Sequence, residues 1–358
     1  MNEKLWTAHF SAHPVMEPID GVKLAFQSAF GCGHLLADHA RVAAYAAAEA
    51  ARAPQDPLAP LYESIGGGLC RLNLKSPAVR RLSGERIADL MFLTADAVGA
   101  GDPSAFDRSL AQLLALARQG RTPFTVEALE DYLAEYRRQG CPVVSHSAAY
   151  RAACAPAYRV VKTALAQLVP LLSEADDRLA EHQQAVIVID GPCAAGKTTL
   201  AACLAKLYQT QPISLDDFFL PPDMRTPDRL SQPGGNVHYE RFLAEVLQPL
   251  SSREDFAFRR FDCATGQMQS RRHAITPVTV IEGSYSHHPA FAKHYQSLHA
   301  IRLWLDVQQD DQLCRLQRRN PEMLQMFHTR WIPLEKTYRE AYHIREKADL
   351  RLKLEGLP

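Results

Sequence analysis

The sequence predicts an α/β fold with a mostly parallel sheet in the second half of the chain, preceded by a mainly α-helical domain. Five consecutive apolar residues, mostly β-branched, precede Asp190, and such a run is typical of a strand buried on both faces of a parallel sheet. Leucines at helical spacing follow within residues 200–207. Because 358 residues are too many for one ordinary core, we expect two domains, residues 1–180 and 181–358.

Composition and charge argue against several classes of partner. The 40 Lys and Arg residues balance the 40 Asp and Glu residues, which argues against a nucleic-acid binder with a broad basic surface. No apolar run approaches the ~20 residues that span a bilayer, and the first residues lack the pattern of a signal peptide. The eight cysteines show no C-x-x-C pair and no metal-ligand quartet. We therefore expect a cytoplasmic protein with free thiols and with neither nucleic-acid nor membrane partners.

The first half of the chain carries mostly helix signals. Helices are predicted over residues 37–52, 85–98, 102–120, 125–136 and 158–182. Asp102 and Thr125 stand at the starts of two of them as candidate N-caps. The polar stretch 173–184 marks the expected domain boundary, and the first half resembles only uncharacterised bacterial proteins.

Three loops of the first half have unusual compositions. They are residues 31–34, the glycine run that leads into a strand-like segment at 65–73, and residues 145–147. The last of these contains His146 and is followed by four hydroxyl or guanidinium side chains, Tyr150, Arg151, Tyr158 and Arg159. Two interpretations remain open. The loops form a second ligand site, or they are turns and helix caps in which His146 is satisfied by local hydrogen bonds.

The break between the predicted strand and the following helix has the form G-x-x-x-x-G-K-T, the phosphate-binding loop of P-loop NTPases. Glycines let successive N–H groups converge on phosphate oxygens, and the helix that follows adds the positive end of its dipole. Lys197 supplies a point charge for the terminal phosphates, and Thr198 a hydroxyl for Mg²⁺. The predicted ATP-binding residues are Gly191, Pro192, Cys193, Ala194, Ala195, Gly196, Lys197, Thr198 and Thr199.

Two acids follow predicted strands of the same sheet. Asp216 follows a short apolar segment at 212–215, and Glu282 ends a buried strand at 278–282. The carboxyl edge of a parallel sheet is where ligands bind in open α/β folds. Asp216 can accept the proton of an attacking hydroxyl or hold Mg²⁺ through water, although a helix cap or Asx-turn is an equal alternative. Glu282 suits a carboxylate bound to Mg²⁺ or to its waters.

Further strands and an arginine-rich helix complete the second half. Strands are predicted over residues 256–262 and 301–306, with a turn at 263–266 after the first of them. The helix after residue 305 ends in Arg315, Arg318 and Arg319. Arginines at this spacing share a helix face, so they either close over phosphates as a lid or form an ordinary solvated face.

The order of these features resembles the uridine kinase-like branch of the P-loop kinases, which also contains phosphoribulokinase and a bacterial pantothenate kinase. The resemblance covers roughly residues 185–353. It implies that Asp216 is a general base and that Glu282 is an acid near the magnesium ion. It also implies an acceptor-site acid at Asp262, a nearby arginine at Arg271, and lid arginines at Arg315, Arg318 and Arg319.

The chain also departs from that family. The signature Asn-Phe-Asp-His-Pro is absent, and residues 235–242 stand in its place, so we expect altered acceptor recognition. The segment 327–335 has no counterpart in the standard enzymes, and either shapes the acceptor pocket or docks on the first half. The predicted substrate-contacting residues are Asp216, Phe218, His238, Tyr239, Asp262 and Arg271.

These observations predict a phosphotransferase that moves the γ-phosphoryl group of ATP to a hydroxyl of a nucleoside, sugar or vitamin-like small molecule. The predicted catalytic residues are Lys197, Asp216, Glu282, Arg315 and Arg319, and the predicted magnesium ligands are Thr198 and Glu282. One alternative is a nucleotide-dependent switch or ATPase whose first half senses a ligand. Another makes the first half an enzyme that acts on the kinase product. A homodimer is compatible with the sequence, which identifies neither the acceptor nor the oligomeric state.

Overall fold

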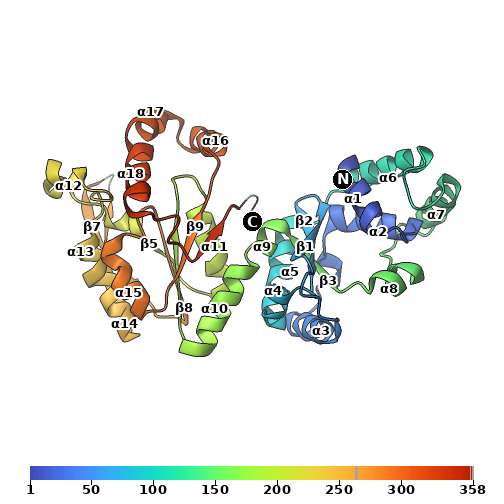
Figure 1. The fold of residues 1–358 in the computed structure, drawn as a ribbon, viewed down its shortest axis with the longest axis horizontal. Helices are drawn as coiled ribbons and strands as arrows, with labels where there is room; N and C mark the ends of the chain where they lie inside the picture. The colour runs from blue at the N-terminus through green and yellow to red at the C-terminus, as the bar shows by residue number, and fades with distance from the viewer. Residues whose placement is uncertain (263–264, 355, 357–358) are drawn as a thin grey trace. The chain divides into compact units, whose positions relative to one another are not determined.

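The computed structural model describes residues 1–262, 265–354 and 356 (Figure 1). The chain divides into two compact units, Met1–Ser173 and Glu174–Leu357. This division falls before the expected boundary at residue 180, within helix α10 (Val169–His182). Asp176 of α10 accepts a hydrogen bond from the Tyr208 hydroxyl at 3.1 Å, which ties the end of this helix to the second unit. Among the described helices, none combines the length and the apolar character that crossing a bilayer requires.

The first unit is rich in helices, as predicted. Its helices are α1 (Glu3–Ala12), α2 (Pro18–Phe30), α3 (His39–Arg52), α4 (Pro77–Arg80), α5 (Gly84–Val98), α6 (Pro103–Arg118), α7 (Val126–Arg138), α8 (Ala148–Cys154) and α9 (Thr163–Ala166). The two predicted N-caps are confirmed. The Asp102 carboxylate accepts from the Ala105 N–H at 2.9 Å, and the Thr125 hydroxyl accepts from the Ala128 N–H at 3.2 Å.

The first unit also contains an antiparallel sheet, which the sequence indicated only in part. Its strands are β1 (Tyr62–Gly66), β2 (Leu69–Asn73) and β3 (Tyr158–Lys162), in the order β1-β2-β3. The predicted helix over residues 158–182 is therefore wrong in its first five residues. Val160 and Val161 are buried in the strand that pairs with β2, and β-branched residues pack well on such a surface.

The second unit contains a five-stranded sheet in which every pair of neighbouring strands is parallel. Its strands are β4 (Ala185–Asp190), β5 (Ile213–Ser214), β8 (Val278–Glu282), β9 (Ile301–Leu305) and β10 (Leu350–Leu352), in the order β10-β9-β4-β8-β5. The predicted strands are confirmed, whereas β10 was not expected. Along the chain, β5 and β8 on one side of β4 come before β9 and β10 on its other side. The strand order therefore changes direction at β4, and ligands bind at such points, beyond the carboxyl ends of the strands.

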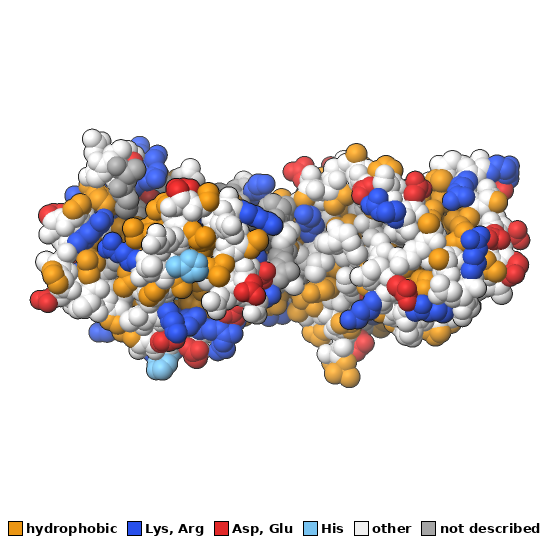
Figure 2. All heavy atoms as spheres, turned by 90° about the horizontal axis from the view of Figure 1, so that it is seen from above, with side chains coloured by type: hydrophobic (Ala, Val, Ile, Leu, Met, Phe, Trp, Pro, Cys, Tyr) orange, Lys and Arg blue, Asp and Glu red, His pale blue; other side chains and the backbone are white. Residues whose placement is uncertain are grey.

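Helices and one hairpin complete the second unit. The helices are α11 (Lys197–Tyr208), α12 (Pro227–Ser231), α13 (Tyr239–Phe242), α14 (Gln248–Ser252), α15 (Ala292–Ser297), α16 (Gln309–Arg319), α17 (Leu324–Met326) and α18 (Ile332–Tyr342). The hairpin pairs β6 (Phe256–Asp262) with β7 (Gln267–His273). Half of the turn predicted at 263–266, residues 263–264, lies outside the described residues. On the face shown in Figure 2, basic and acidic side chains are interspersed.

Candidate active site

The loop that joins β4 to α11 depends on its glycines. Gly191 has φ +153°, and a Cβ atom there would lie only 2.6 Å from the Leu305 carbonyl oxygen. Gly196 has φ +102°, a conformation that side chains disfavour. The two glycines of the sequence motif are therefore explained by local backbone geometry.

Lys197, the first residue of α11, folds back over this loop. Its ammonium group donates to the Gly191 carbonyl at 2.8 Å, to the Pro192 carbonyl at 3.0 Å and to the Ser284 hydroxyl at 3.1 Å. The side chain is buried, so its charge acts in surroundings where water screens it poorly. The positive charge of the Lys197 ammonium group therefore lies at the centre of the loop.

Glu282, at the end of β8, joins two hydroxyl groups from neighbouring elements. Its Oε1 accepts a hydrogen bond from the Ser214 hydroxyl at 2.8 Å, and its Oε2 accepts one from the Thr198 hydroxyl at 3.2 Å. Strand pairing places Glu282 opposite Ile189 of β4, next to the start of the loop. A carboxylate and a hydroxyl are the hard oxygen ligands that Mg²⁺ prefers, so Thr198 and Glu282 fit the predicted magnesium site.

Electrostatic effects connect Asp216 with the same cluster. Burial raises the pKa of Glu282, the charge of Asp216 raises it further, and Ser214, Lys197 and Thr198 oppose both effects. Asp216 exposes part of its side chain, yet the surrounding protein removes enough hydration to raise its pKa, against the charges of Lys197 and Arg319. The two acids and Lys197 therefore lie within electrostatic reach of one another.

The arginine-rich helix α16 contacts the loop through only some of its predicted residues. Arg315 Nη1 donates to the carbonyls of Ala194 and Ala195 at 3.1 and 3.4 Å. Arg319 is exposed and donates to the Asn320 side chain at 2.9 Å, but its charge also lowers the pKa of Asp216. Arg318 is exposed on the surface of α16.

Glu335 of α18 is a residue that the sequence analysis missed. Its Oε2 accepts from the Cys193 backbone N–H at 2.8 Å, and its Oε1 accepts from the Ser284 hydroxyl at 2.7 Å. A carboxylate therefore lies on a loop amide, where the sequence predicts a phosphate oxygen. The only sequence signal was that the segment 327–335 matched nothing in the resembling family.

Asp190 anchors both the loop and α18 to the sheet. It is buried, and its carboxylate accepts from the backbone N–H groups of Gly191 and His287 at 2.7 and 2.9 Å. The Tyr338 hydroxyl donates to the same carboxylate at 2.9 Å. Burial raises the pKa of Tyr338 well above its ordinary value, so this donor keeps its proton at neutral pH.

A cavity of about 340 Å³ opens next to the loop. It is lined by the ends of β4 and β9, by residues that follow β4 and β8, and by α16 and α18, among them Gly191, Pro192, Ser284, Tyr285, Trp304 and Glu335. Its volume falls within the ~300–1,000 Å³ typical of small-molecule pockets.

Three predicted substrate residues serve packing or capping. Phe218 is fully buried, with the Arg241 guanidinium 4.3 Å above its ring. His238 caps α13, because its Nδ1 accepts from the Arg241 N–H at 3.3 Å. Tyr239 stacks on His288, with 4.8 Å between ring centroids.

Besides Asp216, two further predicted substrate residues belong to the β6–β7 hairpin. Asp262 ends β6, and its carboxylate accepts from the Thr265 N–H at 3.3 Å. Burial raises the pKa of Asp217, and the charge of Arg271, which is exposed on β7, is among those that oppose this rise. Asp217 is itself held by Arg260 at 3.1 Å, so the hairpin lies close to the segment that carries Asp216.

Comparison with known proteins gives little beyond this geometry. No protein-family model and no curated protein matches the chain. One similar solved structure is described as a possible uridine kinase from Bacillus stearothermophilus, with 17% sequence identity and a TM-score of 0.38. The match covers 51% of the present chain and 98% of that chain. A similarity of this size identifies neither the activity nor the site of the present protein.

Proposed function

We propose that the second unit is a small-molecule kinase that transfers the γ-phosphoryl group of ATP to a hydroxyl group. One observation carries the proposal. The buried ammonium of Lys197, the Thr198–Glu282 pair and the carboxylate of Asp216 gather beyond the carboxyl edge of a parallel sheet. Phosphoryl transfer needs little more than such a set, because its catalysis consists of positioning and charge stabilisation.

Each residue then has a defined role. Lys197 and the loop N–H groups would bind the phosphates, while Thr198 and Glu282 would hold Mg²⁺, which when bound would neutralise phosphate charge. Asp216 orients the acceptor hydroxyl and accepts its proton as the new O–P bond forms and the bond to ADP breaks. The raised pKa of Asp216 makes its carboxylate a better proton acceptor than an ordinary aspartate. Arg319 adds positive charge from α16.

An acceptor screen with labelled ATP tests this function. The full chain is incubated with Mg²⁺, ATP labelled on its γ-phosphate and panels of nucleosides, sugars and vitamin-like alcohols. A kinase transfers label to one chemical class and consumes ATP slowly without it. Hydrolysis at the same rate with every acceptor, or no turnover at all, contradicts the proposal.

The variant Asp216→Asn tests the assigned base once an acceptor is found. We expect kcat to fall by ~10²–10⁴, the usual contribution of a general base, while ATP affinity changes little. Asp223→Asn, at an exposed aspartate of the same loop region, serves as the matched control and should keep full turnover. Unchanged kcat in Asp216→Asn would remove this residue from the mechanism.

A second candidate function has its own observation. Glu335 accepts the hydrogen bond of the Cys193 backbone N–H, and the Tyr338 hydroxyl donates to Asp190, directly before the loop. A phosphate that binds the Cys193 N–H would therefore have to displace part of α18. Displacement of a helix by nucleotide is the behaviour of a switch. ATP binding that changes the protease sensitivity of α18 without dependence on any acceptor would favour the switch over the kinase.

A further inference from the structure

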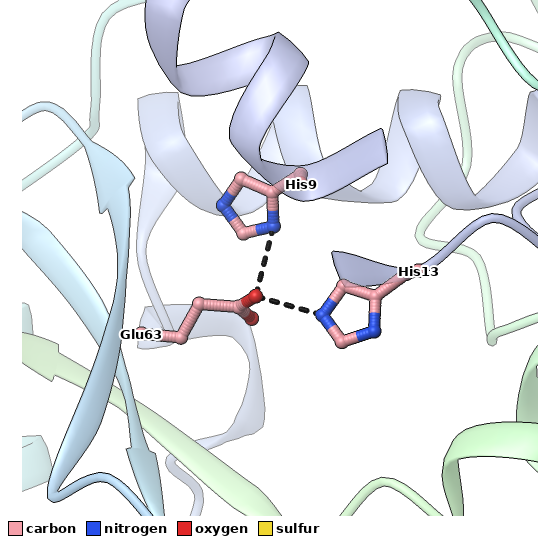
Figure 3. A group of neighbouring side chains, drawn as sticks. All are labelled: His9, His13 and Glu63. Carbon is pink, nitrogen blue, oxygen red and sulfur yellow. Dashed lines mark hydrogen bonds and ion pairs between the residues drawn. The ribbon is translucent and has the colours of Figure 1, made fainter. Parts of the chain in front are cut away.

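A second group of side chains that could bind a ligand belongs to the first unit. Figure 3 shows His9 of α1 and His13, the residue that follows α1, pointing toward Glu63 of β1. His9 lies in the last turn of the helix, and His13 is its C-cap. His13 Nε2 lies 2.7 Å from Glu63 Oε1, and His9 Nδ1 lies 3.1 Å from the same oxygen. The three candidate ligand atoms all lie within 4.8 Å of one another.

The hydrogen bond of His9 to Ser64 accounts for one of its two ring nitrogens, Nε2, but not for the other, Nδ1. Its Nε2 lies 2.8 Å from the Ser64 carbonyl oxygen, which can only accept, so Nε2 carries a proton. Nδ1 is buried and lies 3.1 Å from the carboxylate of Glu63 without the geometry of a hydrogen bond, and the side chain is only 2% exposed. A nitrogen lone pair and a carboxylate repel each other at this distance unless a proton or a metal ion lies between them.

We propose that His9 Nδ1, His13 Nε2 and Glu63 Oε1 bind a divalent transition-metal ion of the zinc type. Metal–ligand bonds of about 2.0–2.2 Å at tetrahedral angles place neighbouring ligand atoms ~3.3 Å apart. The His9–Glu63 distance of 3.1 Å is close to this value, and the His13–Glu63 distance of 2.7 Å requires a shift of only about half an ångström. Two imidazoles and one carboxylate favour Zn²⁺ or Fe²⁺ over the hard ions Mg²⁺ and Ca²⁺.

The surroundings orient both rings for this task. Metal-bound histidines usually donate their other N–H to a carbonyl or a similar acceptor, as His9 does to Ser64. His13 Nδ1 lies 3.6 Å from the Cys154 sulfur, a weaker partner of the same kind. Three protein ligands leave a fourth position open, which is the arrangement of catalytic rather than structural zinc sites.

Arg71 limits the affinity of the proposed site for a metal ion. Its Nη1 lies 3.4 Å from Glu63 Oε2, so this oxygen is engaged and Glu63 offers only Oε1 to the metal. The positive charge of Arg71 also repels a divalent ion, so we expect micromolar rather than nanomolar affinity. Arg71 Nη1 further donates to the Tyr150 hydroxyl at 3.3 Å, which connects the site to the cluster around His146 that the sequence singled out.

Metal titration of the full chain tests the proposal. The protein is stripped with a chelator, dialysed and titrated with ZnCl₂ by calorimetry, and with CoCl₂ by visible absorption, which reports nitrogen and oxygen ligation. We expect one equivalent of Zn²⁺ to bind in the first unit. His13→Ala and Glu63→Gln should each weaken that binding at least tenfold, because each removes a ligand.

Two controls make the outcome decisive. His39→Ala removes an exposed histidine of the same unit, which pairs with Asp89, and should bind Zn²⁺ like the unmodified chain. Glu282→Gln should retain the equivalent, which separates this site from the magnesium ligands of the second unit. Circular dichroism confirms that each variant is folded. The proposal is overturned if the unmodified chain binds no stoichiometric Zn²⁺, or if His13→Ala binds it as tightly as His39→Ala.

Discussion

Gly191 shows how a single residue determines the path of the candidate loop. Its backbone conformation is one that side chains disfavour, and it also approaches the end of β9 closely. The sequence motif predicted that a glycine belongs here because phosphate must reach the backbone. The structure adds a second reason, since the neighbouring strand leaves no space for a side chain.

Gly191→Ala should therefore destabilise the protein more than an alanine at an uncrowded glycine. The new Cβ would have to displace the Leu305 carbonyl, 2.6 Å away, and overpacking of this kind costs about 1–3 kcal/mol. Gly120→Ala is the matched control, because Gly120 has φ +65° and no atom within 4 Å of the added Cβ. Urea unfolding of both variants gives the difference. Equal loss of stability in the two variants would show that the loop accommodates the added Cβ of Gly191→Ala without strain.

The two acids of the candidate site make stability depend on pH. Burial raises the pKa of Glu282, and loss of hydration raises that of the partly exposed Asp216, so the folded state binds these protons more tightly than the unfolded state does. Stability contributed by such groups is greatest below the ordinary carboxyl range, near pH 4, and falls as pH rises toward the raised values. The charged site therefore destabilises the free protein at neutral pH.

Asp216→Asn should remove part of this cost. We expect a higher Tm than that of the unmodified chain at pH 7–8, and a smaller decrease in Tm between pH 5 and pH 8. Scanning calorimetry across this range measures both. A lower Tm for the variant at pH 8 would mean that Asp216 makes a stabilising ion pair rather than carrying a strained charge.

At the scale of elements, α18 is the part of the second unit that the resembling family does not explain. Its Glu335 and Tyr338 lie on one face, three residues apart, and bind the loop and Asp190. Helix and loop are thereby joined through hydrogen bonds to charged groups, which contribute about 1.5–3 kcal/mol each. A phosphate bound at the Cys193 amide, as proposed above, would compete with this helix.

Glu335→Gln should consequently raise ATP affinity about tenfold, since a neutral amide competes less well than a carboxylate for the Cys193 N–H. Calorimetric titration with a non-hydrolysable ATP analogue and Mg²⁺ measures the change. Glu340→Gln is the control on the same helix, because Glu340 is exposed and pairs at the surface with Lys336 and Arg339. Weaker binding in Glu335→Gln would instead make this carboxylate a ligand of the nucleotide complex.

At the scale of the whole molecule, the chain consists of two compact units with different architectures. The second has a parallel sheet with its own apolar core, and the first combines helices with a small antiparallel sheet. Chains of this kind commonly depart from a single two-state transition. The candidate phosphate loop belongs to one unit and the proposed metal site to the other.

Heating the full chain should therefore give two calorimetric transitions with separate ligand responses. A ligand at about 100 times its Kd adds ~2.7 kcal/mol, which corresponds to a shift of ~5–10 °C for a unit of this size. The ATP analogue with Mg²⁺ should raise one transition, and this shift should be absent in Lys197→Ala. Zn²⁺ should raise the other, and His13→Ala should remove that shift. A common shift of both transitions by either ligand would show that the units unfold together.

Local patterns in the sequence predicted most of the second unit. A β-branched run, a glycine motif and acids placed directly after strands are signals between neighbouring residues, and the strands and the Thr198–Glu282 contact followed them. The helix starts at Asp102 and Thr125 were equally local. Where propensity was ambiguous, as over residues 158–162, pairing with a distant strand decided the outcome.

The sequence by itself thus determined the parallel sheet, the glycine-dependent loop and the residue types beyond its strands, because these depend on interactions over a few positions. Only the tertiary structure brought Glu335 to the loop and His9 and His13 to Glu63, across separations of fifty residues or more. No periodic pattern in the sequence predicts such contacts. They form because packing of the cores places distant segments together, and burial then sets the charges and hydrogen bonds that the side chains can keep.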